Sequence, residues 1–385
     1  MRQIYLDNGA TSFPKAPGVV DAMTHFLANV GSNTGRGIYE SSFEAEHIVY
    51  ETRELIAELF HFPTPSHVIF TKNITESINV ILKGILRAGD HVIVSSVEHN
   101  AVMRPLHALA SKGITFSKVK CSTEGVLNPE DIRQEIKKET RAVVMTHASN
   151  VSGTILDLES VGQICRDNGI FFIVDAAQTV GFVDVDFQKL QADAIAFTGH
   201  KSLLGPQGMG GFIVSEAFAK SMTTFIEGGT GSLSDRETQP EYLPDKFEAG
   251  TLNIPGIYGL HAALQYLNQT GLENIQKKEL HLVTQFILGL QEMEGIRIIG
   301  KKGSKERTGV VSIDVPEFDN ASISYQLYAK YGIATRCGMH CAPSAHETLG
   351  TFPQGTVRFS FSHFNEMNDV TDALKALKEI ISEQQ

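Results

Sequence analysis

The chain has 385 residues, of which 42% are hydrophobic and 20% are charged, an ordinary composition for a soluble globular protein of two domains or one large α/β unit. Its formal net charge of −11 argues against nucleic acid or an anionic membrane as the main partner, and no apolar run approaches the ~18 residues of a membrane-spanning helix. Residues 1–7 are typical of a strand and contain no signal-peptide core, and the four cysteines are too scattered for a disulfide framework. We therefore expect a cytoplasmic protein.

Short apolar runs alternate with helical patterns through the first two thirds of the chain. A capping box, Ser41-x-x-Glu44, predicts a helix that runs to about Phe60. The expected strands are 67–70, 91–95, 142–145, 171–174, 194–197 and 211–214, and the expected helices between them include 75–86, 129–137 and 158–168. This alternation predicts an α/β fold with a mostly parallel sheet that helices cover on both faces. Residues 228–246, rich in Gly, Ser, Asp and Pro, are expected to form a long loop.

The pattern changes after about Pro255. Two consecutive helices are expected there, and the remaining elements alternate between strand and helix; in order they are helices 256–267 and 272–292, strands 296–299 and 310–313, helix 321–331, strand 357–361 and a last helix. This arrangement predicts a smaller α+β domain. We expect a large α/β domain of residues 15–255 and a small domain that combines residues 1–14 with 256–385.

Lys201 lies in a Gly/Ser/His-rich turn, 26 residues after Asp175, which closes the apolar run 171–175. A lysine amine can form a Schiff base with pyridoxal phosphate (PLP), and an acid can keep the pyridine nitrogen of that cofactor protonated. The pair alone is weak, because most loop lysines are solvated surface groups.

Other polar residues follow neighbouring strands in the same way. Thr75 lies in a turn that enters a helix, where free N–H groups can hold a phosphate. His99 follows the next strand and can stack on a ring, while Asn150 and Gln178 offer amide hydrogen bonds. Ligands of open α/β sheets bind at the carboxyl ends of the strands, so these groups predict one common site.

The segment 336–343, Arg-Cys-Gly-Met-His-Cys-Ala-Pro, is the other outstanding element, and Arg358 follows it. Arginine suits a bidentate grip on a substrate carboxylate, and a cysteine near Arg and His has more thiolate than a free cysteine. Two other interpretations remain open. Cys337, His340, Cys341 and His346 could bind a metal, although this is not a standard zinc spacing, or both cysteines could be structural.

Together these segments resemble the cysteine desulfurases, a branch of the class V aminotransferase superfamily (PLP fold type I) that also includes selenocysteine lyases. The resemblance runs from the Tyr5–Thr11 segment to Arg358. It is carried by Glu98-His99, Asp175-Ala-Ala-Gln178, the Lys201 turn, Phe247–Asn253 and Arg336-x-Gly-x-His-Cys341. The Arg-x-Gly-x-x-Cys motif is typical of the short-loop desulfurases. Membership implies a large domain with a seven-stranded, mostly parallel sheet.

The resemblance also implies roles for individual residues. Lys201 would carry PLP and move the Cα proton of the substrate, Cys341 would take up sulfur as a persulfide, and His99 would stack on the cofactor ring and share the acid–base steps. The other implied cofactor residues are Ile74, through its backbone N–H, Thr75, Asp175, Gln178, Thr198, His200 and, from a second subunit, Thr251. The implied substrate-binding residues are Ala10, Arg36, Asn150, Arg336 and Arg358.

The implied protein is a homodimer that converts L-cysteine to L-alanine and delivers sulfur to an acceptor protein, as iron–sulfur cluster assembly requires. Alternatives are a selenocysteine lyase, a class V aminotransferase or lyase for another amino acid, which would not need Cys341, and a metal- or sulfur-binding module without PLP. A nicotinamide enzyme is disfavoured because no Gly-x-Gly-x-x-Gly follows an early strand. The sequence departs from the family at Ile74, where a second Thr is usual, at Gly35, where His is common, and at the additional thiol of Cys337.

Overall fold

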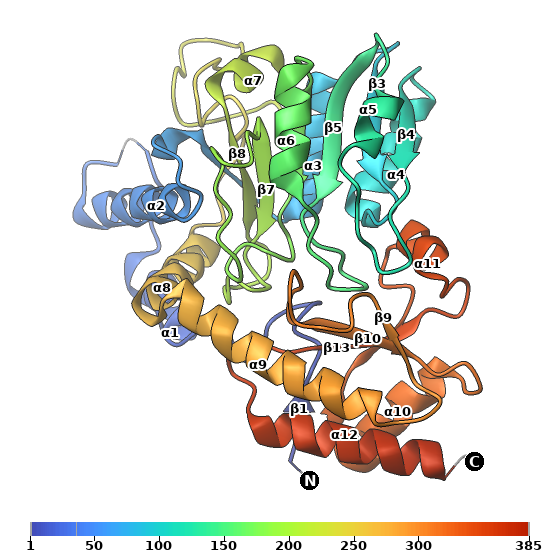
Figure 1. The fold of residues 1–385 in the computed structure, drawn as a ribbon. Coiled ribbons are helices and arrows are strands. Elements are labelled where there is room, and N and C mark those ends of the chain that lie inside the picture. The colour runs from blue at the N-terminus through green and yellow to red at the C-terminus, as the bar shows by residue number, and fades with distance from the viewer. Residues whose placement is uncertain (1, 36, 384–385) are drawn as a thin grey trace.

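The computed structural model describes residues 2–35 and 37–383, and its largest element is a seven-stranded sheet (Figure 1). The strand order is β2-β8-β7-β6-β5-β3-β4. Their bounds are β2 Val68–Thr71, β3 His91–Ser95, β4 Thr115–Val119, β5 Thr140–Thr146, β6 Phe171–Asp175, β7 Ala194–Thr198 and β8 Gly210–Val214. Strand β8 is antiparallel to both of its neighbours and the remaining pairs are parallel, which confirms the expected α/β fold.

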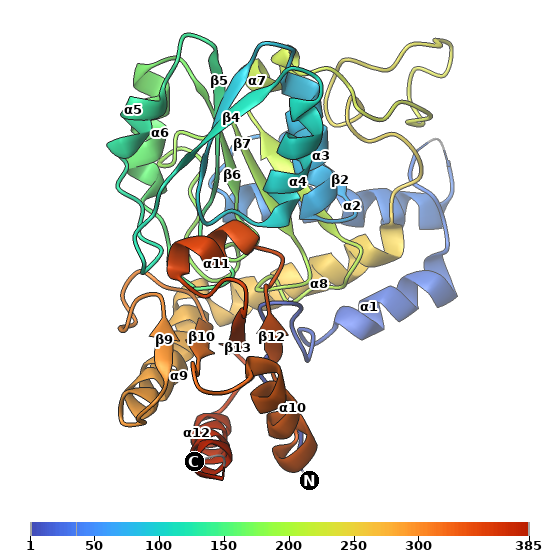
Figure 2. The same cartoon turned by 90° about the vertical axis from the view of Figure 1, so that its right-hand side faces the viewer.

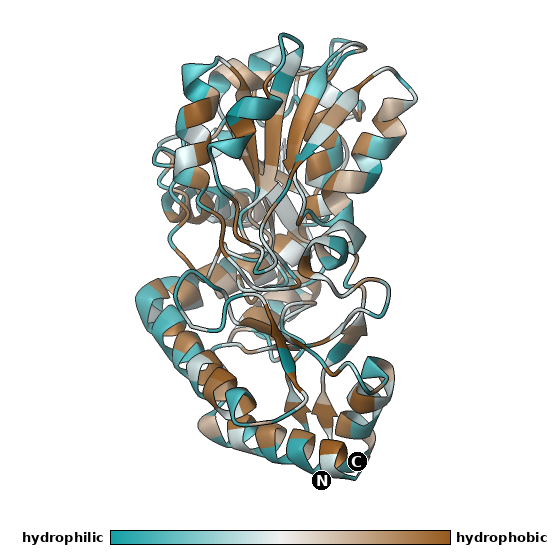
Figure 3. Ribbon diagram, turned by 45° about the vertical axis from the view of Figure 1, so that its right-hand side comes forward, coloured by the Kyte–Doolittle hydropathy of each residue, from teal (hydrophilic) through white to brown (hydrophobic). Residues whose placement is uncertain are grey.

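Helices cover both faces of this sheet, and each face has its own apolar core. Successive side chains of a strand point to opposite faces, so Ile93 of β3 belongs to one core while Val92 and Val94 belong to the other. Figure 3 shows the result as hydrophobic strands between helices with one apolar side. The helices of this part are α1 Val19–His25, α2 Glu40–Leu59, α3 Ile74–Ile85, α4 Asn100–Ala110, α5 Asp131–Glu135, α6 Leu158–Asp167, α7 Glu216–Ser221 and α8 Ile254–Thr270.

A four-stranded antiparallel sheet in the order β12-β13-β10-β9 lies beyond the carboxyl ends of the parallel strands (Figure 2). Strand β1 pairs instead with β11, in parallel. The strands here are β1 Ile4–Tyr5, β9 Arg297–Ile299, β10 Val310–Asp314, β11 Ile333–Ala334, β12 Arg336–Gly338 and β13 Thr356–Ser360. The helices are α9 Leu272–Gln291, α10 Asn320–Tyr331, α11 Pro343–Leu349 and α12 Met367–Ser382. Phe286 of α9, Phe359 of β13 and Leu377 of α12 meet in a third apolar core.

Some sequence-based expectations fail for local reasons. The capping box is wrong: α2 begins at Glu40, its N-cap Tyr39 makes no side-chain cap, and the Ser41 hydroxyl contacts the hydroxyl of Ser32 instead. Strand β4 has no apolar run that would predict it, because it is an edge strand whose side chains are mostly exposed or half-buried. The long loop is confirmed, since residues 222–253 form no helix or strand. In the described part of the chain no helix is long and apolar enough to cross a membrane.

Candidate active site

The polar residues predicted at the strand ends meet between the two sheets. Lys201 lies in the turn after β7, and its charge interacts with Asp175 at the end of β6. Arg336 of β12 and Arg358 of β13 approach Lys201 from the four-stranded sheet. The structure therefore brings these four residues together at the carboxyl ends of the parallel strands.

Burial lowers the pKa of Lys201 to about 8. The positive charges of Arg358 and Arg336 contribute to this lowering, while the carboxylates of Asp175 and Asp7 oppose it. A lysine with this pKa has a substantial neutral fraction near neutral pH, whereas an exposed lysine has almost none. The amine of Lys201 is therefore prepared to act as a nucleophile or a base.

Asp175 has only 3% of its surface exposed and accepts a hydrogen bond from the backbone N–H of Ala177 at 2.9 Å. Burial raises the pKa of this carboxyl, while the Ala177 N–H and the Lys201 charge act in the opposite direction. Gln178 is also buried, and its amide nitrogen donates to the carbonyl of Gly9 at 3.2 Å. A cationic ring nitrogen would offset the cost of keeping Asp175 ionised in this position.

Two buried polar atoms near Lys201 have no hydrogen-bond partner among the described residues: Oγ1 of Thr198 and Nδ1 of His200. Buried polar atoms are nearly always bonded, so these two are available to bind a ligand. Helix α3, which begins with Ile74 and Thr75, packs beside β7, the strand that ends at Thr198. An added Cβ on Gly210, the β8 partner of Thr198, would lie 2.7 Å from the backbone of Asn73. The donors fit a phosphate, which binds well at a helix N-terminus.

Thr251, unlike Asp175, Gln178 and Thr198, is exposed to solvent. It lines a cavity of about 270 Å³ together with Thr71, Lys72 and Glu76, from the turn that enters α3 in the same chain. The cavity therefore lies between the loop before α8 and the turn that enters α3. Arg36, expected at the entrance, lies outside the described residues.

His99 caps helix α4, and its Nδ1 accepts the backbone N–H of Ala101 at 3.0 Å. Because Nδ1 is an acceptor, the proton of the neutral ring must be on Nε2. Burial lowers the pKa of His99 to about 4, and the charges of Lys201, Arg336 and Arg358 add to the shift. His99 is therefore a neutral imidazole that can stack on a ring and donate from Nε2.

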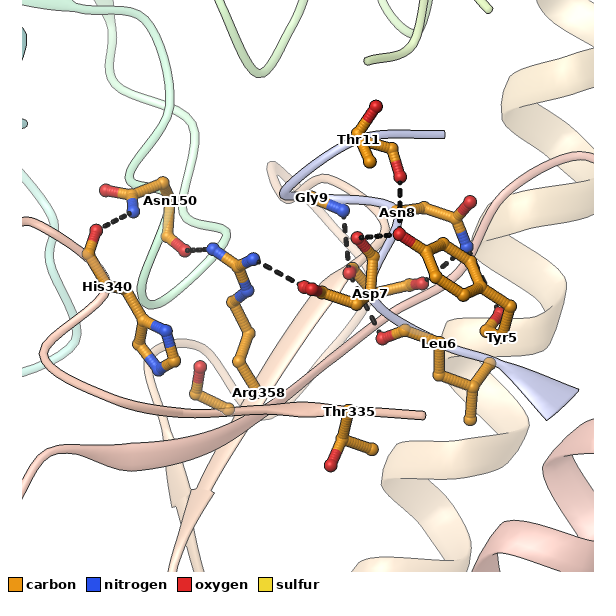
Figure 4. A network of polar contacts seen from close by, with 12 residues as sticks. Tyr5, Leu6, Asp7, Asn8, Gly9, Thr11, Asn150, Thr335, His340 and Arg358 are labelled. Atoms are coloured by element: carbon orange, nitrogen blue, oxygen red, sulfur yellow. Dashed lines mark hydrogen bonds and ion pairs between the residues drawn. The ribbon is translucent and has the colours of Figure 1, made fainter. Parts of the chain in front are cut away.

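Arg358 is the centre of a polar network between the sheets (Figure 4). It is 1% exposed, its Nη2 donates to Oδ1 of Asp7 at 2.9 Å, and its Nη1 donates to the carbonyl of Asn150 at 3.2 Å. Gly9 lies against the guanidinium, since an added Cβ there would come within 3.3 Å of Arg358 Cζ. Ala10, next along the chain, donates its N–H to the Asp7 carbonyl at 3.0 Å. The role of Asp7 could not be inferred from sequence, because its partner is 351 residues away.

Cys341 is exposed on the loop between β12 and α11. Its φ of +57° and the φ of +45° at His340 place two consecutive non-glycine residues in the left-handed region, a costly conformation that tends to occur at functional sites. Hydrogen bonds hold both carbonyls: the N–H of Asn100 donates to Cys341 at 2.8 Å, and the side chain of Asn150 donates to His340 at 2.8 Å. Since Asn100 follows His99, the thiol-bearing residue is fixed beside that imidazole.

The expectation that His340 favours the Cys341 thiolate is wrong. His340 is buried, pairs through Nε2 with the hydroxyl of Thr356 at 2.9 Å, and has its pKa lowered by burial to about 2. It is therefore uncharged and adds no positive potential. Arg336 remains as the nearby cation of the segment.

Cys337 is exposed and immediately follows Arg336 in β12. Arg336 pairs with Arg358 across the sheet, so both side chains share one face. The side chain of Cys337 must point to the opposite face, because side chains alternate along a strand. The two cysteines therefore differ in their relation to the site.

Comparison with known proteins agrees with this geometry. The family described as Aminotransferase class-V matches residues 4–373. A probable cysteine desulfurase of Methanothermobacter thermautotrophicus is 34% identical over 381 residues, which cover 98% of this chain and 94% of that protein. The chain belongs to the class-V aminotransferase family. The cysteine desulfurase of Haloferax volcanii is 32% identical over 98% of this chain and 90% of its own length, which places the chain in the cysteine desulfurase branch.

Solved structures show the same relation. The apo cysteine desulfurase of Thermococcus onnurineus superposes with a TM-score of 0.93 at 34% identity, covering 99% of this chain and 95% of that chain. The cysteine desulfurase CsdA of Escherichia coli gives a TM-score of 0.89 at 28% identity, with coverage of 99% and 95%. The PLP fold type I expected from the sequence is thus confirmed for this class-V aminotransferase.

The interpretation of segment 337–346 as a metal cluster gains no support. Within residues 2–35 and 37–383, no group of three or more His, Cys, Asp or Glu side chains is arranged to hold a metal ion. The rings of His340 and His346 are 5.7 Å apart, and each donates or accepts at a threonine hydroxyl, Thr356 and Thr351 respectively. Both histidine rings are therefore engaged in hydrogen bonds within the chain.

Glu98, which precedes His99, is a buried acid to which the sequence assigned no role. It is 0% exposed, and both of its carboxyl oxygens accept the N–H of Thr146 at 3.0 Å. Burial raises the pKa of Glu98 to about 8, and the nearby charge of Asp175 acts in the same direction. Glu98 ties the ends of β3 and β5 together beneath the site while remaining protonated at neutral pH.

We expect Glu98→Gln to change how stability depends on pH. The folded pKa is above the unfolded value, so the wild type loses stability as pH rises from about 5 to about 8, and a glutamine cannot ionise. The free energy of unfolding of the wild type, relative to the variant, should fall by on the order of 3 kcal/mol over that range. Urea denaturation at several pH values measures it, and parallel pH profiles for the two proteins would contradict a raised pKa.

Proposed function

We propose that this protein is a PLP-dependent cysteine desulfurase that converts L-cysteine to L-alanine and takes up the sulfur on Cys341 as a persulfide. The observation that carries the proposal is that an exposed thiol and a lysine of lowered pKa are both held near His99. The N–H of Asn100 and the side chain of Asn150 hold the Cys341 segment next to His99, and Lys201 interacts with His99 from the turn after β7. The names of the similar proteins support the same activity.

PLP fits the buried residues between the sheets. When bound, it supplies an electron sink that makes the Cα–H of an amino acid acidic. Lys201 would hold it covalently, Asp175 would pair with its ring nitrogen, Gln178 would bond its ring oxygen, and His99 would stack on its ring. The phosphate would take the unpartnered atoms of Thr198 and His200, the N–H of Ile74 and the hydroxyl of Thr75, with Thr251 of a partner subunit completing the set.

The substrate carboxylate would bind at Arg358 and Asn150. The salt bridge to Asp7 at 2.9 Å fixes the guanidinium, and its Nε has no partner within the described chain. A buried, oriented arginine binds a carboxylate with little loss of side-chain entropy. Arg336, Arg36 and Ala10 would line the remainder of this substrate pocket.

The chain's own groups then handle protons and sulfur. Lys201, with a pKa of about 8, takes the Cα proton, and the neutral ring of His99 donates a hydrogen bond from Nε2. The thiolate of Cys341 attacks the substrate sulfur: an S–S bond forms and the Cβ–S bond breaks. The electron pair of the broken bond stays on the substrate carbon, which takes a proton and leaves as part of alanine.

A homodimer would cover an apolar surface on α1, on α2 and between them. Its members are exposed large hydrophobic residues: Val20, Leu27, Ile38 (91% exposed), Tyr39 and Phe43. Such clusters commonly mark interfaces, and a two-fold axis would also let Thr251 reach the neighbouring site.

We infer a large domain of residues 15–255 and a small domain of residues 1–14 with 256–385. All four cysteines are free thiols, which suits the cytoplasm, where an acceptor protein would receive the sulfur.

Incubation of the purified protein with PLP and L-cysteine tests the proposal. We expect equal amounts of alanine and of sulfur, the sulfur appearing on Cys341 or as sulfide once a reductant is added, from a species that light scattering shows to have the mass of two chains. Parallel assays with L-selenocysteine identify a selenium-specific lyase, and transamination products from other amino acids identify an aminotransferase. A protein that binds PLP but forms no alanine from cysteine contradicts the proposal.

A further inference from the structure

The segment that carries Asn150 is hydrogen-bonded to the part of the chain that contains the four-stranded sheet. Four consecutive carbonyl groups, those of residues 150–153, each accept a hydrogen bond from that side of the molecule. The donors are, in order, Nη1 of Arg358 (3.2 Å), Oγ of Ser312 (2.6 Å), Nη2 of Arg307 (3.2 Å) and the backbone N–H of Thr308 (2.8 Å). The loop after β5 is thus held, residue by residue, by two strands of the other sheet and by the loop that precedes β10.

The register of the sheet explains how Ser312 and Arg358 come to donate to neighbouring carbonyl groups. Ser312 of β10 is the direct partner of Arg358 in β13, and Arg358 is the direct partner of Arg336 in β12. Directly paired residues of neighbouring strands share a face, so the three side chains form a row across the sheet. The row places the Ser312 hydroxyl on the same face as the two arginines of the substrate pocket.

Arg307 is an unusual member of this contact. It is 1% exposed, and its guanidinium donates to main-chain carbonyls, those of Ser152, Val310, Lys301 and Gly303. Burial lowers its pKa to about 10, and no carboxylate among the described residues opposes that effect. A buried cation without a counterion is costly, and an apolar side chain would avoid the cost. The guanidinium therefore points to a positional role.

The 150–153 segment is connected to the Cys341 turn through Asn150. Asn150 uses its carbonyl to accept from Arg358 and its side chain to donate to the carbonyl of His340, the residue before Cys341. His340 and Cys341 both have positive φ, a conformation that persists only where neighbouring contacts impose it. The contact from Asn150 is one of the two that hold these carbonyls, so a displaced 150–153 segment would release the Cys341 turn.

We propose that Arg307 and Ser312 are positioning residues for Cys341, acting through the carbonyl groups of residues 150–153 and the side chain of Asn150. Neither residue needs to touch the substrate. The role of the thiol in sulfur uptake rests on the proposed function, but the conformation of the Cys341 turn can be measured without any turnover.

Alkylation of the full-length protein as purified tests the inference, with Cys337 as an internal reference. Both cysteines are exposed and lie in one segment, so peptide mass spectrometry can follow the rates at which iodoacetamide modifies each. Ser312→Ala removes one oxygen and leaves the Val151 carbonyl without its donor. We expect the ratio of the Cys341 rate to the Cys337 rate to rise by about threefold or more, as the turn is released from its strained geometry. Hydrogen exchange at the Asn100 N–H, which donates to Cys341, should accelerate in parallel.

Matched variants separate positioning from general destabilisation. Thr52→Val also removes a fully buried hydroxyl that bonds a carbonyl, that of Ile48 in its own helix, and should leave the ratio as in the wild type. Ser312→Thr keeps the hydroxyl and should give the same ratio of alkylation rates as the wild type. Arg307→Lys keeps the charge without the planar fork, should raise the ratio as Ser312→Ala does, and decides the question if Ser312→Ala does not fold.

An unchanged ratio in Ser312→Ala, or an equal change in Thr52→Val, overturns the inference. These outcomes are independent of the proposed function. If the wild type forms alanine from cysteine and Ser312→Ala leaves the ratio unchanged, only the positioning role is rejected. If Ser312→Ala raises the ratio but the wild type forms no alanine, the positioning role stands and the proposed desulfurase activity is rejected.

Discussion

Lys201→Ala is expected to lower alanine formation from L-cysteine by at least about 10⁴-fold while the protein remains folded. The variant loses both the amine that would hold PLP and the base that would take the Cα proton. Its loss should cost little stability, because the buried amine has its pKa lowered by desolvation and is stabilised poorly as a cation. Reduction with borohydride, followed by peptide mapping, should place the cofactor on Lys201 in the wild type and nowhere in the variant.

Lys15 provides a stringent control for this assignment. Burial also lowers its pKa to about 8, and its Nζ donates to the hydroxyls of Thr11 and Ser12, each at 3.2 Å, and to the carbonyl of His200 at 3.3 Å. Lys15 is thus a second amine of similar basicity, next to a residue expected to bind phosphate. Mapping of the reduced cofactor to Lys15, or full activity of Lys201→Ala, would show that the sequence pattern selected the wrong lysine.

The central part of the site could be predicted because its residues follow consecutive strands. A parallel sheet brings the carboxyl ends of its strands to one edge, so polar residues after each apolar run had to converge. Lys201, Asp175 and His99 were found in this way, and each lies where the alternation of strands and helices places it. The arginines and Cys341 came from a short motif and from resemblance, because the pairing of β12 with β13 has no signal in their spacing.

The remainder depends on contacts between distant segments and on burial. Asp7 meets Arg358, and the side-chain donors to residues 150–153 lie between 155 and 208 positions later in the chain, so no local pattern could reveal them. The charge of His340 illustrates the second limit. Its sequence position beside Cys341 predicts a cation, but burial lowers its pKa and makes it neutral, and burial is a property of the folded chain.

Cys341→Ser is expected to abolish persulfide formation and to lower alanine formation by at least about 10³-fold, because a hydroxyl is a far weaker nucleophile towards sulfur than a thiolate. Binding of PLP should be unchanged, since the Cys341 loop supplies none of the groups expected to hold it. The absorption spectrum of the bound cofactor and mass spectrometry after a single turnover with L-cysteine measure the two effects separately.

Cys337→Ser is the matched control, because it makes the same chemical change four residues earlier in another exposed cysteine. Cys337 is on the opposite face of β12 from Arg336, whereas the turn at His340 and Cys341 is bonded to the loops that carry His99 and Asn150. We therefore expect Cys337→Ser to keep alanine formation within about twofold of the wild type and to place all of the persulfide on Cys341. If Cys337→Ser stopped turnover while Cys341→Ser retained it, the roles of the two thiols would be reversed, and the left-handed turn would need an explanation other than presentation of a nucleophile.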